Sequence, residues 1–307
     1  MLRYILRRVL EFIPVLFIIV TVVFFLVRLA PGGPFEATER DVPPEVLQAI
    51  KAQYNLDAPL HIQYVDYLRK LAQGDLGPSL QKPSRTVTEW ILYRFPKSLE
   101  LGLYALGVAL VVGLAAGIMA ALRPNTMTDY APMSLSMAGI CIPNFVLGPV
   151  LVLIFALWLG WLPVSGWNTP ESKILPSLTL GAPFAAYVAR LTRGGMFEVL
   201  SQDFIRTARA KGLSESRVIL RHALRGGLQP VIVFLGPATA GLLTGSFVVE
   251  TIFQVPGLGR EFVDAAFRRD YTMIMGVVLF YGVLILVMNL VVDIVVAWLD
   301  PRVRVGQ

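Results

Sequence analysis

The sequence is poor in cysteine, histidine and charge. Its 307 residues include one cysteine and two histidines, and 16% are charged, against about 25% in soluble domains. A single Cys141 can form no internal disulfide and no multi-cysteine metal site, and its place in an apolar run predicts a buried, inert thiol. His61 and His222 have no companions at metal-ligand spacing. A zinc site and a disulfide framework are therefore excluded.

Signatures of catalysis and nucleotide binding are also missing. No Gly-x-x-x-x-Gly-Lys-Ser/Thr phosphate loop occurs, so the chain should not bind ATP by that means. The apolar runs contain neither paired aspartates nor His-Glu-x-x-His, one of which a membrane-embedded enzyme would need, and no triad of nucleophile, base and orienting group can be assembled. We expect a chain that is not an enzyme and has no cofactor or metal site of its own.

Apolar residues are abundant and gather in long uncharged runs. They make up 55% of the chain, the mean hydropathy is +0.65, and a spanning helix needs about 20 mostly apolar residues. The sequence therefore predicts an all-α polytopic membrane protein with six transmembrane helices. The expected spans are 9–30, 99–122, 132–159, 174–196, 227–249 and 272–298.

Several residues within the runs carry expectations of their own. Pro143 should kink the third span. Gly113 and Gly117, at four-residue spacing, are suited to a close helix contact. Charged residues within membrane spans are candidates for function, but those toward the span ends are expected more often to serve at the membrane interface or in packing: Glu11, Arg28, Glu250 and Asp293.

The basic residues indicate the orientation. An even number of spans puts both termini on one side, and both termini carry arginines; basic flanks mark the cytoplasmic side. The segment 190–225 is also basic, with eight basic residues against three acidic ones. We therefore expect a multi-pass protein of the bacterial cytoplasmic (inner) membrane, with both termini in the cytoplasm.

The segment 31–97 is predicted to be a folded extracytoplasmic segment between the first two spans. It has eight basic and eight acidic residues and is too long for the positive-inside count to apply. Prolines at first helical turns predict one helix from Pro43 to about Tyr54 and another from Pro59 to about Gln73. Because five more spans follow, we interpret the first apolar run as a retained anchor and not a cleaved signal peptide.

The loop at 198–225, which we call the elbow, is the best candidate for function. Residues up to Lys211 favour a short helix that Gly212 can end in the left-handed conformation. Ser214 can cap a second helix, in which Arg217, Arg221 and Arg225 recur on one face. The apolar contacts of that helix would come from Val218, Ile219, Leu220 and Leu224.

Three interpretations of the elbow remain open at this level. It could be a loop whose arginines only set topology and meet anionic headgroups. It could be a helix-turn-helix for nucleic acid, although about thirty residues between spans are too few for the supporting helical core. It could also be a docking element for a cytoplasmic partner, since Ala208, Ala210 and Gly212 are small enough for close approach.

A resemblance favours the docking element. The stretch Arg206-Thr-Ala-Arg-Ala-Lys-Gly212, followed after nine residues by His222-Ala-Leu-Arg225, resembles the motif of ABC importer permease subunits. That motif reads Glu-Ala-Ala, three residues, Gly, nine residues, Ile, one residue, Leu-Pro. The match holds at Ala208, Gly212 and Leu224. It departs at Arg206, Thr207, His222 and Arg225.

The resemblance to the dipeptide and oligopeptide permease family covers the whole chain. The segments that carry it are Met1–Arg8, Arg28–Gly32, Gly74–Gly77, Ile142–Phe145, Leu175–Ser177, Val255–Gly259 and Arg269–Tyr271. Four further segments favour B-type subunits of the oligopeptide branch over the dipeptide, nickel and glutathione branches. They are Pro34–Phe35, Pro43–Val46, Arg190–Arg193 and Val249–Ile252.

The resemblance implies one permease subunit of an ATP-driven peptide importer, with residues 1–307 as its transmembrane domain. A second homologous permease of the C type would complete the pathway, two ATPase subunits would bind ATP and magnesium, and an extracytoplasmic binding protein would deliver the peptide. A self-contained secondary transporter is the rival. The residues implied in ATPase coupling are Asp203, Arg206, Thr207, Ala208, Arg209, Ala210, Lys211, Gly212 and His222.

Overall fold

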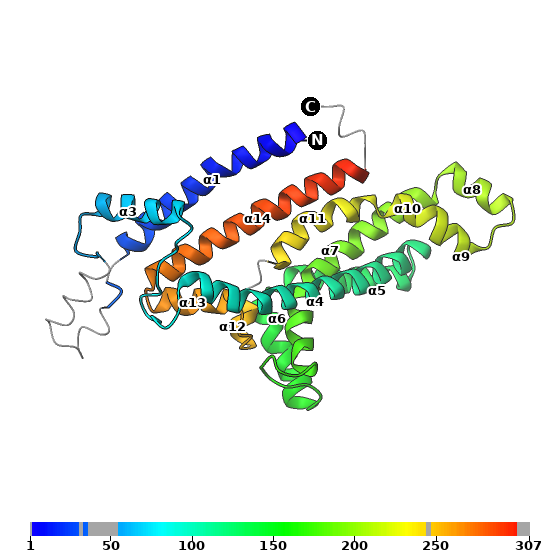
Figure 1. Ribbon diagram of the computed structural model, residues 1–307. Coiled ribbons are helices and arrows are strands. Elements are labelled where there is room, and N and C mark those ends of the chain that lie inside the picture. Colours follow the sequence, from blue (N-terminus) through cyan, green and yellow to red (C-terminus); the bar gives the residue numbers. More distant parts are fainter. Residues whose placement is uncertain (1, 31–32, 36–54, 244–246, 300–307) are drawn as a thin grey trace. The chain divides into compact units, whose positions relative to one another are not determined.

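The computed structural model describes residues 2–30, 33–35, 55–243 and 247–299, with backbone alone at 2–5 and 295–299. These parts are almost entirely helical (Figure 1). The elements are α1 (Leu2–Leu29), α3 (Leu60–Ala72), α4 (Val87–Leu122), α5 (Met127–Cys141), α6 (Asn144–Leu151), the π-helix η1 (Val152–Trp158), the 3-10 turn η2 (Glu171–Lys173), α7 (Ile174–Leu200), α8 (Asp203–Ala210), α9 (Glu215–Arg217), the π-helix η3 (Val218–Ala223), α10 (Leu224–Gly227), α11 (Gln229–Leu243), α12 (Phe247–Ile252), α13 (Leu258–Phe267) and α14 (Tyr271–Leu299).

The long apolar helices fall on the apolar runs of the sequence, but α4 begins at Val87, well before the start expected at residue 99. Within the described residues five segments, built on α1, α4, α7, α11 and α14, are long and apolar enough to cross a membrane, and the bent pair of α5 with α6 and η1 would make a sixth. The expected all-α membrane fold is confirmed. That residues 31–97 lie outside the membrane stays a prediction, and the helix expected at Pro43–Tyr54 lies outside the described residues.

The third span differs from the single helix expected at 132–159. Helix α5 ends at Cys141, Ile142 is extended with φ −83° and ψ 116°, and α6 begins after Pro143. The two halves are bent by 114°. Proline has no N–H to donate and pushes the preceding residue out of the helical region. Pro143 thus produces the expected kink as a full break in the helix.

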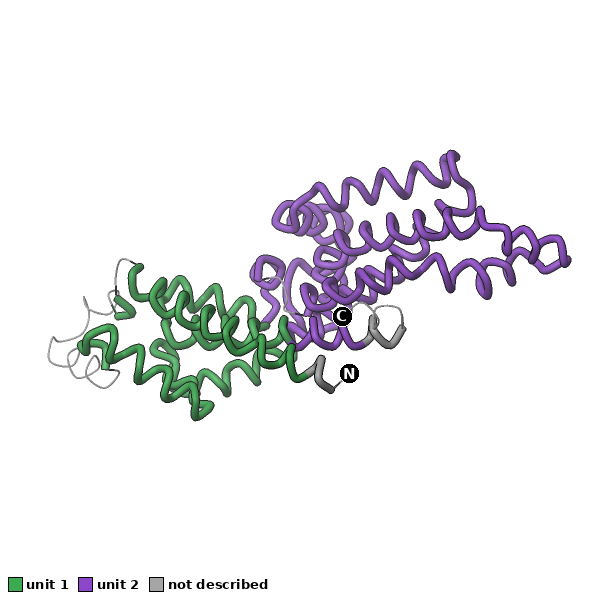
Figure 2. Tube along the Cα trace, turned by 90° about the horizontal axis from the view of Figure 1, so that it is seen from above, with its two compact units in different colours: residues 1–96, 257–286 green, residues 97–256, 287–307 purple. Residues whose placement is uncertain are grey.

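The chain forms two compact units, coloured separately in Figure 2. The first comprises residues 1–96 and 257–286. Within it, α3 begins directly after Pro59, as the sequence predicts. The ring of Phe24 contacts the rings of Tyr64 and Tyr67 at centroid distances of 5.1 and 5.8 Å, and Thr21 Oγ1 shares a 2.7 Å hydrogen bond with the hydroxyl of Tyr64. Helix α3 is therefore fastened to α1.

Asp270 organises the loop before α4 in the same unit. Its buried carboxylate accepts hydrogen bonds from the hydroxyl of Ser79 and from the backbone amides of Leu80 and Gln81, at 3.1 and 3.2 Å. It also accepts from the amide of Met273 at 3.1 Å, which makes it the N-cap of α14. One carboxylate therefore joins the loop to the start of a spanning helix.

The second unit comprises residues 97–256 and 287–307, and close contact of α4 with α7 holds part of it together. A Cβ atom on Gly113 would lie 2.6 Å from the carbonyl oxygen of Ala185, and one on Gly117 would lie 2.5 Å from that of Ala189. Both distances are too short for any side chain, so the close contact expected of this glycine pair is confirmed.

The prediction that Cys141 is buried is wrong for this chain. The thiol was expected to be buried, yet Cys141 is exposed at the end of α5. In a membrane protein an apolar run can face lipid or another subunit as well as the chain's own core, and these environments have the same composition. The apolar sequence around Cys141 therefore does not mean burial within this chain.

Candidate functional site

The elbow is two short helical arms joined at Gly212. Gly212 has φ +77°, the left-handed conformation that the sequence predicts. Its amide donates to the carbonyl of Arg209 at 2.9 Å, and the amide of Leu213 donates to that of Ala208 at 3.4 Å. These two bonds form the Schellman motif that ends α8. The turn is thus defined by backbone geometry that glycine adopts without strain.

The second arm begins at Ser214 without the expected side-chain cap. Ser214 occupies the N-cap position with extended backbone, φ −61° and ψ 144°, but its hydroxyl makes no capping hydrogen bond. Its carbonyl accepts from the amides of Arg217 and Val218 at 2.9 and 3.0 Å. The arm then widens into the π-helix η3. π-Helical turns are rare and often occur at functional sites.

A bidentate ion pair joins the two arms across the turn. Arg209 Nε and Nη2 donate to the two carboxylate oxygens of Glu215 at 3.1 and 2.6 Å. These hydrogen bonds hold the pKa of Glu215 below its ordinary value. The pair is therefore formed at neutral pH and is lost as the pH falls through the folded-state pKa of Glu215. Both side chains are about half exposed, so the pair contributes modestly.

An apolar core fastens the elbow to the ends of two spanning helices. Ile205 of α8 and Val218 of the second arm are fully buried. They belong to one cluster with Met196 and Val199 of α7 and Ala121 of α4. A movement of either arm must therefore displace the ends of α4 and α7.

A close contact between two glycines also joins α7 to α10, the helix that follows the elbow. A Cβ atom on Gly195 of α7 would lie 2.2 Å from the carbonyl oxygen of Gly227 of α10. The backbones of the two helices therefore touch directly, with no side chain between them. The chain that follows the elbow is therefore packed directly against α7.

The residues implied in coupling divide into an outward set, one half-buried residue and one inward residue. Ala208 is 6% exposed and packs in the elbow's own core, so its side chain faces α7 rather than the outer surface. His222 is half-buried. The outward-facing residues are Asp203, Arg206, Thr207, Arg209, Ala210, Lys211 and Gly212.

Two apolar residues on the elbow surface were not anticipated as contacts. Phe204 is 47% exposed on α8, and Leu220 is 69% exposed on η3, where the sequence placed it in the packed set. Exposed aromatic and aliphatic side chains amid charged neighbours are typical anchors of protein interfaces. The spacing of Ile205 and Ala208, which marks the inner stripe of α8, would have indicated that Phe204 points outward.

An ion pair between α5 and α7 was also missed by the sequence. Arg193 Nε and Nη2 donate to the two oxygens of Asp129 at 2.6 and 2.8 Å, and the backbone amide of Asn125 donates to Asp129 at 3.0 Å. Asp129 is 1% exposed and Arg193 is 35% exposed. This pair links α5 to the helix that leads into the elbow.

Comparison with known proteins gives family matches along almost the whole chain. Residues 113–305 match the family described as binding-protein-dependent transport system inner membrane component. Residues 1–102 match the N-terminal family of the same membrane components.

Curated relatives align from end to end. The oligopeptide transport system permease protein OppB of Haemophilus influenzae is 50% identical, over 99% of this chain and 100% of the relative. OppB of Escherichia coli K12 is 48% identical over the same shares. The dipeptide transport system permease protein DppB of Bacillus subtilis is 44% identical, over 100% of this chain and 99% of the relative.

Solved structures share the fold at low sequence identity. An inward-facing MetNI methionine ABC transporter aligns with a TM-score of 0.57 and 16% identity, over 69% of this chain and 96% of that one. An amino acid ABC transporter aligns with a TM-score of 0.54 and 17% identity, over 68% and 94%. At this identity the likeness describes the fold alone.

Proposed function

This chain belongs to the family of binding-protein-dependent transport system inner membrane components, and from that premise we propose that it forms half of the pathway of an ATP-driven oligopeptide importer. The observation that carries the proposal is its end-to-end identity of 48 to 50% with oligopeptide permeases. The 44% identity with a dipeptide permease supports the same substrate class. The chain is thus a transporter subunit and not an enzyme.

The proposed assembly supplies what this chain lacks. A permease with no phosphate loop needs partners that hydrolyse ATP. We assign to it a second, homologous permease of the C type, two ATPase subunits that bind ATP and magnesium, and an extracytoplasmic binding protein that delivers the peptide.

We assign ATPase docking to the elbow. Its outward face presents charged side chains on α8 together with the exposed ring of Phe204, a combination that suits a protein partner. Its inner face is packed against the ends of α4 and α7. A displacement imposed on α8 by an ATPase would therefore pass into the spanning helices, which is what an ATP-driven switch between inward-open and outward-open states requires.

The proposed topology puts both termini and the elbow in the bacterial cytoplasm and residues 31–97 outside. Cysteines introduced at Ser84 and Ser216, both exposed, are expected to react from opposite sides of the membrane. Cys141 is first replaced by alanine because it is itself exposed. A membrane-impermeant maleimide added to intact cells should label Ser84→Cys and not Ser216→Cys. The reverse pattern, or labelling of both, would refute the topology.

The proposed function predicts a strict dependence on partners. The purified chain alone should hydrolyse ATP no faster than a mock preparation, because it has no phosphate loop. Reconstituted with the second permease, the ATPases and the delivery protein, it should import labelled oligopeptide only when ATP is supplied. Uptake by this chain alone, driven by an ion gradient without ATP, would establish a secondary transporter instead.

A further inference from the structure

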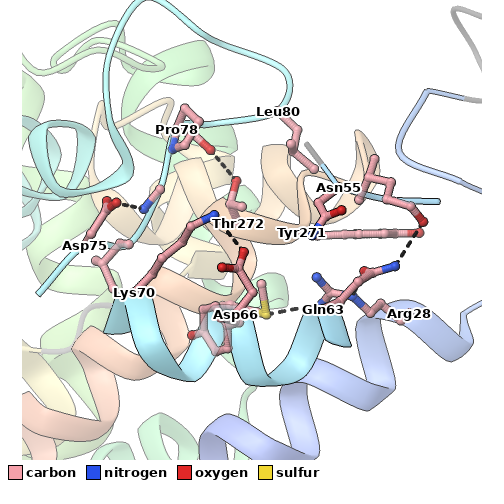
Figure 3. Close-up of a pocket in the computed structure, with 15 residues that line it drawn as sticks. Arg28, Asn55, Gln63, Asp66, Lys70, Asp75, Pro78, Leu80, Tyr271 and Thr272 are labelled. Atoms are coloured by element: carbon pink, nitrogen blue, oxygen red, sulfur yellow. Dashed lines mark hydrogen bonds and ion pairs between the residues drawn. The ribbon is translucent and has the colours of Figure 1, made fainter. Parts of the chain in front are cut away.

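The first compact unit contains a pocket of about 200 Å³ that is lined by both charged and apolar side chains (Figure 3). Its walls come from the end of α1, from α3, from the loop that Asp270 organises and from the start of α14. Leu56, Leu80 and Met275 contribute apolar surface, and the charged side chains of the lining are Arg28, Asp66, Lys70 and Asp75. Neither the family assignment nor the elbow uses this pocket.

Arg28, in the last turn of α1, presents a fixed guanidinium to the pocket. Its Nε donates to Oε1 of Gln63 at 2.9 Å, its Nη1 lies 3.6 Å from Sδ of Met275, and its guanidinium carbon lies 3.7 Å from the ring centroid of Phe24. The amide nitrogen of Gln63 is anchored in turn by two backbone carbonyls before α3, at 2.9 and 2.8 Å. The guanidinium is therefore oriented without a bound ligand.

The pocket is lined by two cationic and two anionic side chains, but they are not evenly distributed around it. Lys70 pairs with Asp66 at 2.8 Å, and Asp75 accepts a 2.8 Å hydrogen bond from the amide of Gly77. In Figure 3, Lys70 and Asp75 lie on the opposite side of the pocket from Arg28. No carboxylate among the described residues pairs with Arg28. Within the described part of the chain, the cation at this end of the pocket is thus held by a neutral amide and an aromatic ring and not by a carboxylate.

We propose that this pocket binds a carboxylate of the transported peptide and that Arg28 recognises it. With Nε engaged by Gln63, the hydrogens of Nη2 and one of Nη1 remain for a bidentate pair, the geometry in which arginine binds carboxylates. At about 200 Å³ the pocket has room for a carboxylate with its nearest carbon atoms, and the rest of the peptide would lie outside it. The inference rests on the proposed function, which brings peptides to the outer end of α1.

The experiment compares two probes in the complete reconstituted transporter. Uptake of tetra-alanine and of tetra-alanine amide is measured with the wild type and with Arg28→Gln. We expect the variant to lose about tenfold in uptake efficiency for the free acid, equivalent to about 1.4 kcal/mol, with little change for the amide. The ratio of wild-type to variant uptake is taken for each peptide, and the ratio for the acid is divided by the ratio for the amide. Any preference of the delivery protein cancels in this quotient, because the same delivery protein is used with the wild type and the variant.

A matched control changes the other cation of the pocket. Lys70→Gln removes a charge that is already paired with Asp66 and should affect both peptides equally. If Arg28→Gln does not assemble, Arg28→Lys takes its place, because it keeps the charge but loses the bidentate geometry. The loss of uptake for the acid relative to the amide is then measured in the same way.

Three results are decisive. Equal losses for the acid and the amide would overturn the proposal and make Arg28 a contact for the delivery protein or a lipid phosphate. Unchanged uptake of both peptides would overturn it as well. If the wild-type assembly imports neither peptide with ATP, the proposed function itself fails. A defect that appears only in Arg28→Gln leaves the proposed function intact, so the two failures are distinguishable.

Discussion

Replacement of Gly212 by valine is expected to lower ATP-driven peptide uptake by about tenfold while the chain still inserts in the membrane. Gly212 has φ +77°, where a β-branched residue costs on the order of 1 to 2 kcal/mol. No atom lies within 4 Å of a Cβ built at this position, so the whole effect comes from the backbone. The strained turn would release α8 from its set angle and weaken ATPase docking or uncouple hydrolysis from uptake.

Two glycine variants serve as controls for this result. Gly212→Asn should stay near wild type, because asparagine tolerates the left-handed region. Gly194→Val adds the same side chain into open space on α7 at an ordinary φ and should also be mild. Peptide uptake and peptide-stimulated hydrolysis are measured in the same vesicles. Wild-type values of both for Gly212→Val would show that the elbow is only a topology signal.

Arg193→Ala is expected to destabilise the protein by about 3 kcal/mol, clearly more than Asp129→Ala. The asymmetry follows from burial, since Asp129 is 1% exposed and Arg193 is 35% exposed. Removing the arginine strands a buried carboxylate with one backbone hydrogen bond, from Asn125. Removing the aspartate leaves a guanidinium that water can reach. The measurement is the midpoint of thermal unfolding of the assembled transporter.

The double variant separates pairing from packing. Arg193→Ala combined with Asp129→Ala should be more stable than Arg193→Ala alone, because no unpaired buried charge remains. Equal stability of the two single variants would contradict the assignment of the cost to the stranded carboxylate. A parallel loss of uptake in Arg193→Ala would connect the pair with the transmission of movement from the elbow to α5.

Features set by local backbone stereochemistry could be predicted from the sequence. Pro59 fixes the start of α3, and Gly212 takes the left-handed conformation because glycine, which has no Cβ atom, adopts it without steric cost. The glycine pair at Gly113 and Gly117 also follows a local rule, since its spacing puts both on one helix face. In each case the cause lies within a few residues of the effect.

Features that depend on distant residues could not be predicted. Arg193 was counted as one of several topology charges, and its partner Asp129 is 64 residues away in the chain. The sequence places Arg28 at a span end but not beside Gln63, because the contact between α3 and α1 arises only in the tertiary structure. The size of Ala208 and its place in the motif indicate a role in coupling but not its orientation, which follows from the buried stripe that it forms with Ile205.

The break between α5 and α6 has a consequence for where water can reach. Pro143 has no N–H, so the carbonyl of Gly139 is left without a helical donor in the last turn of α5. The amides of Val146 and Leu147 both return to the carbonyl of Pro143 and offer nothing to that turn. Lipid chains cannot donate a hydrogen bond to an unpaired carbonyl. Irregular backbone within a bilayer must therefore be in contact with water or be covered by polypeptide. Wherever this break lies within the bilayer, we expect water or another part of the assembly to cover the exposed surface around Cys141 and Ile142.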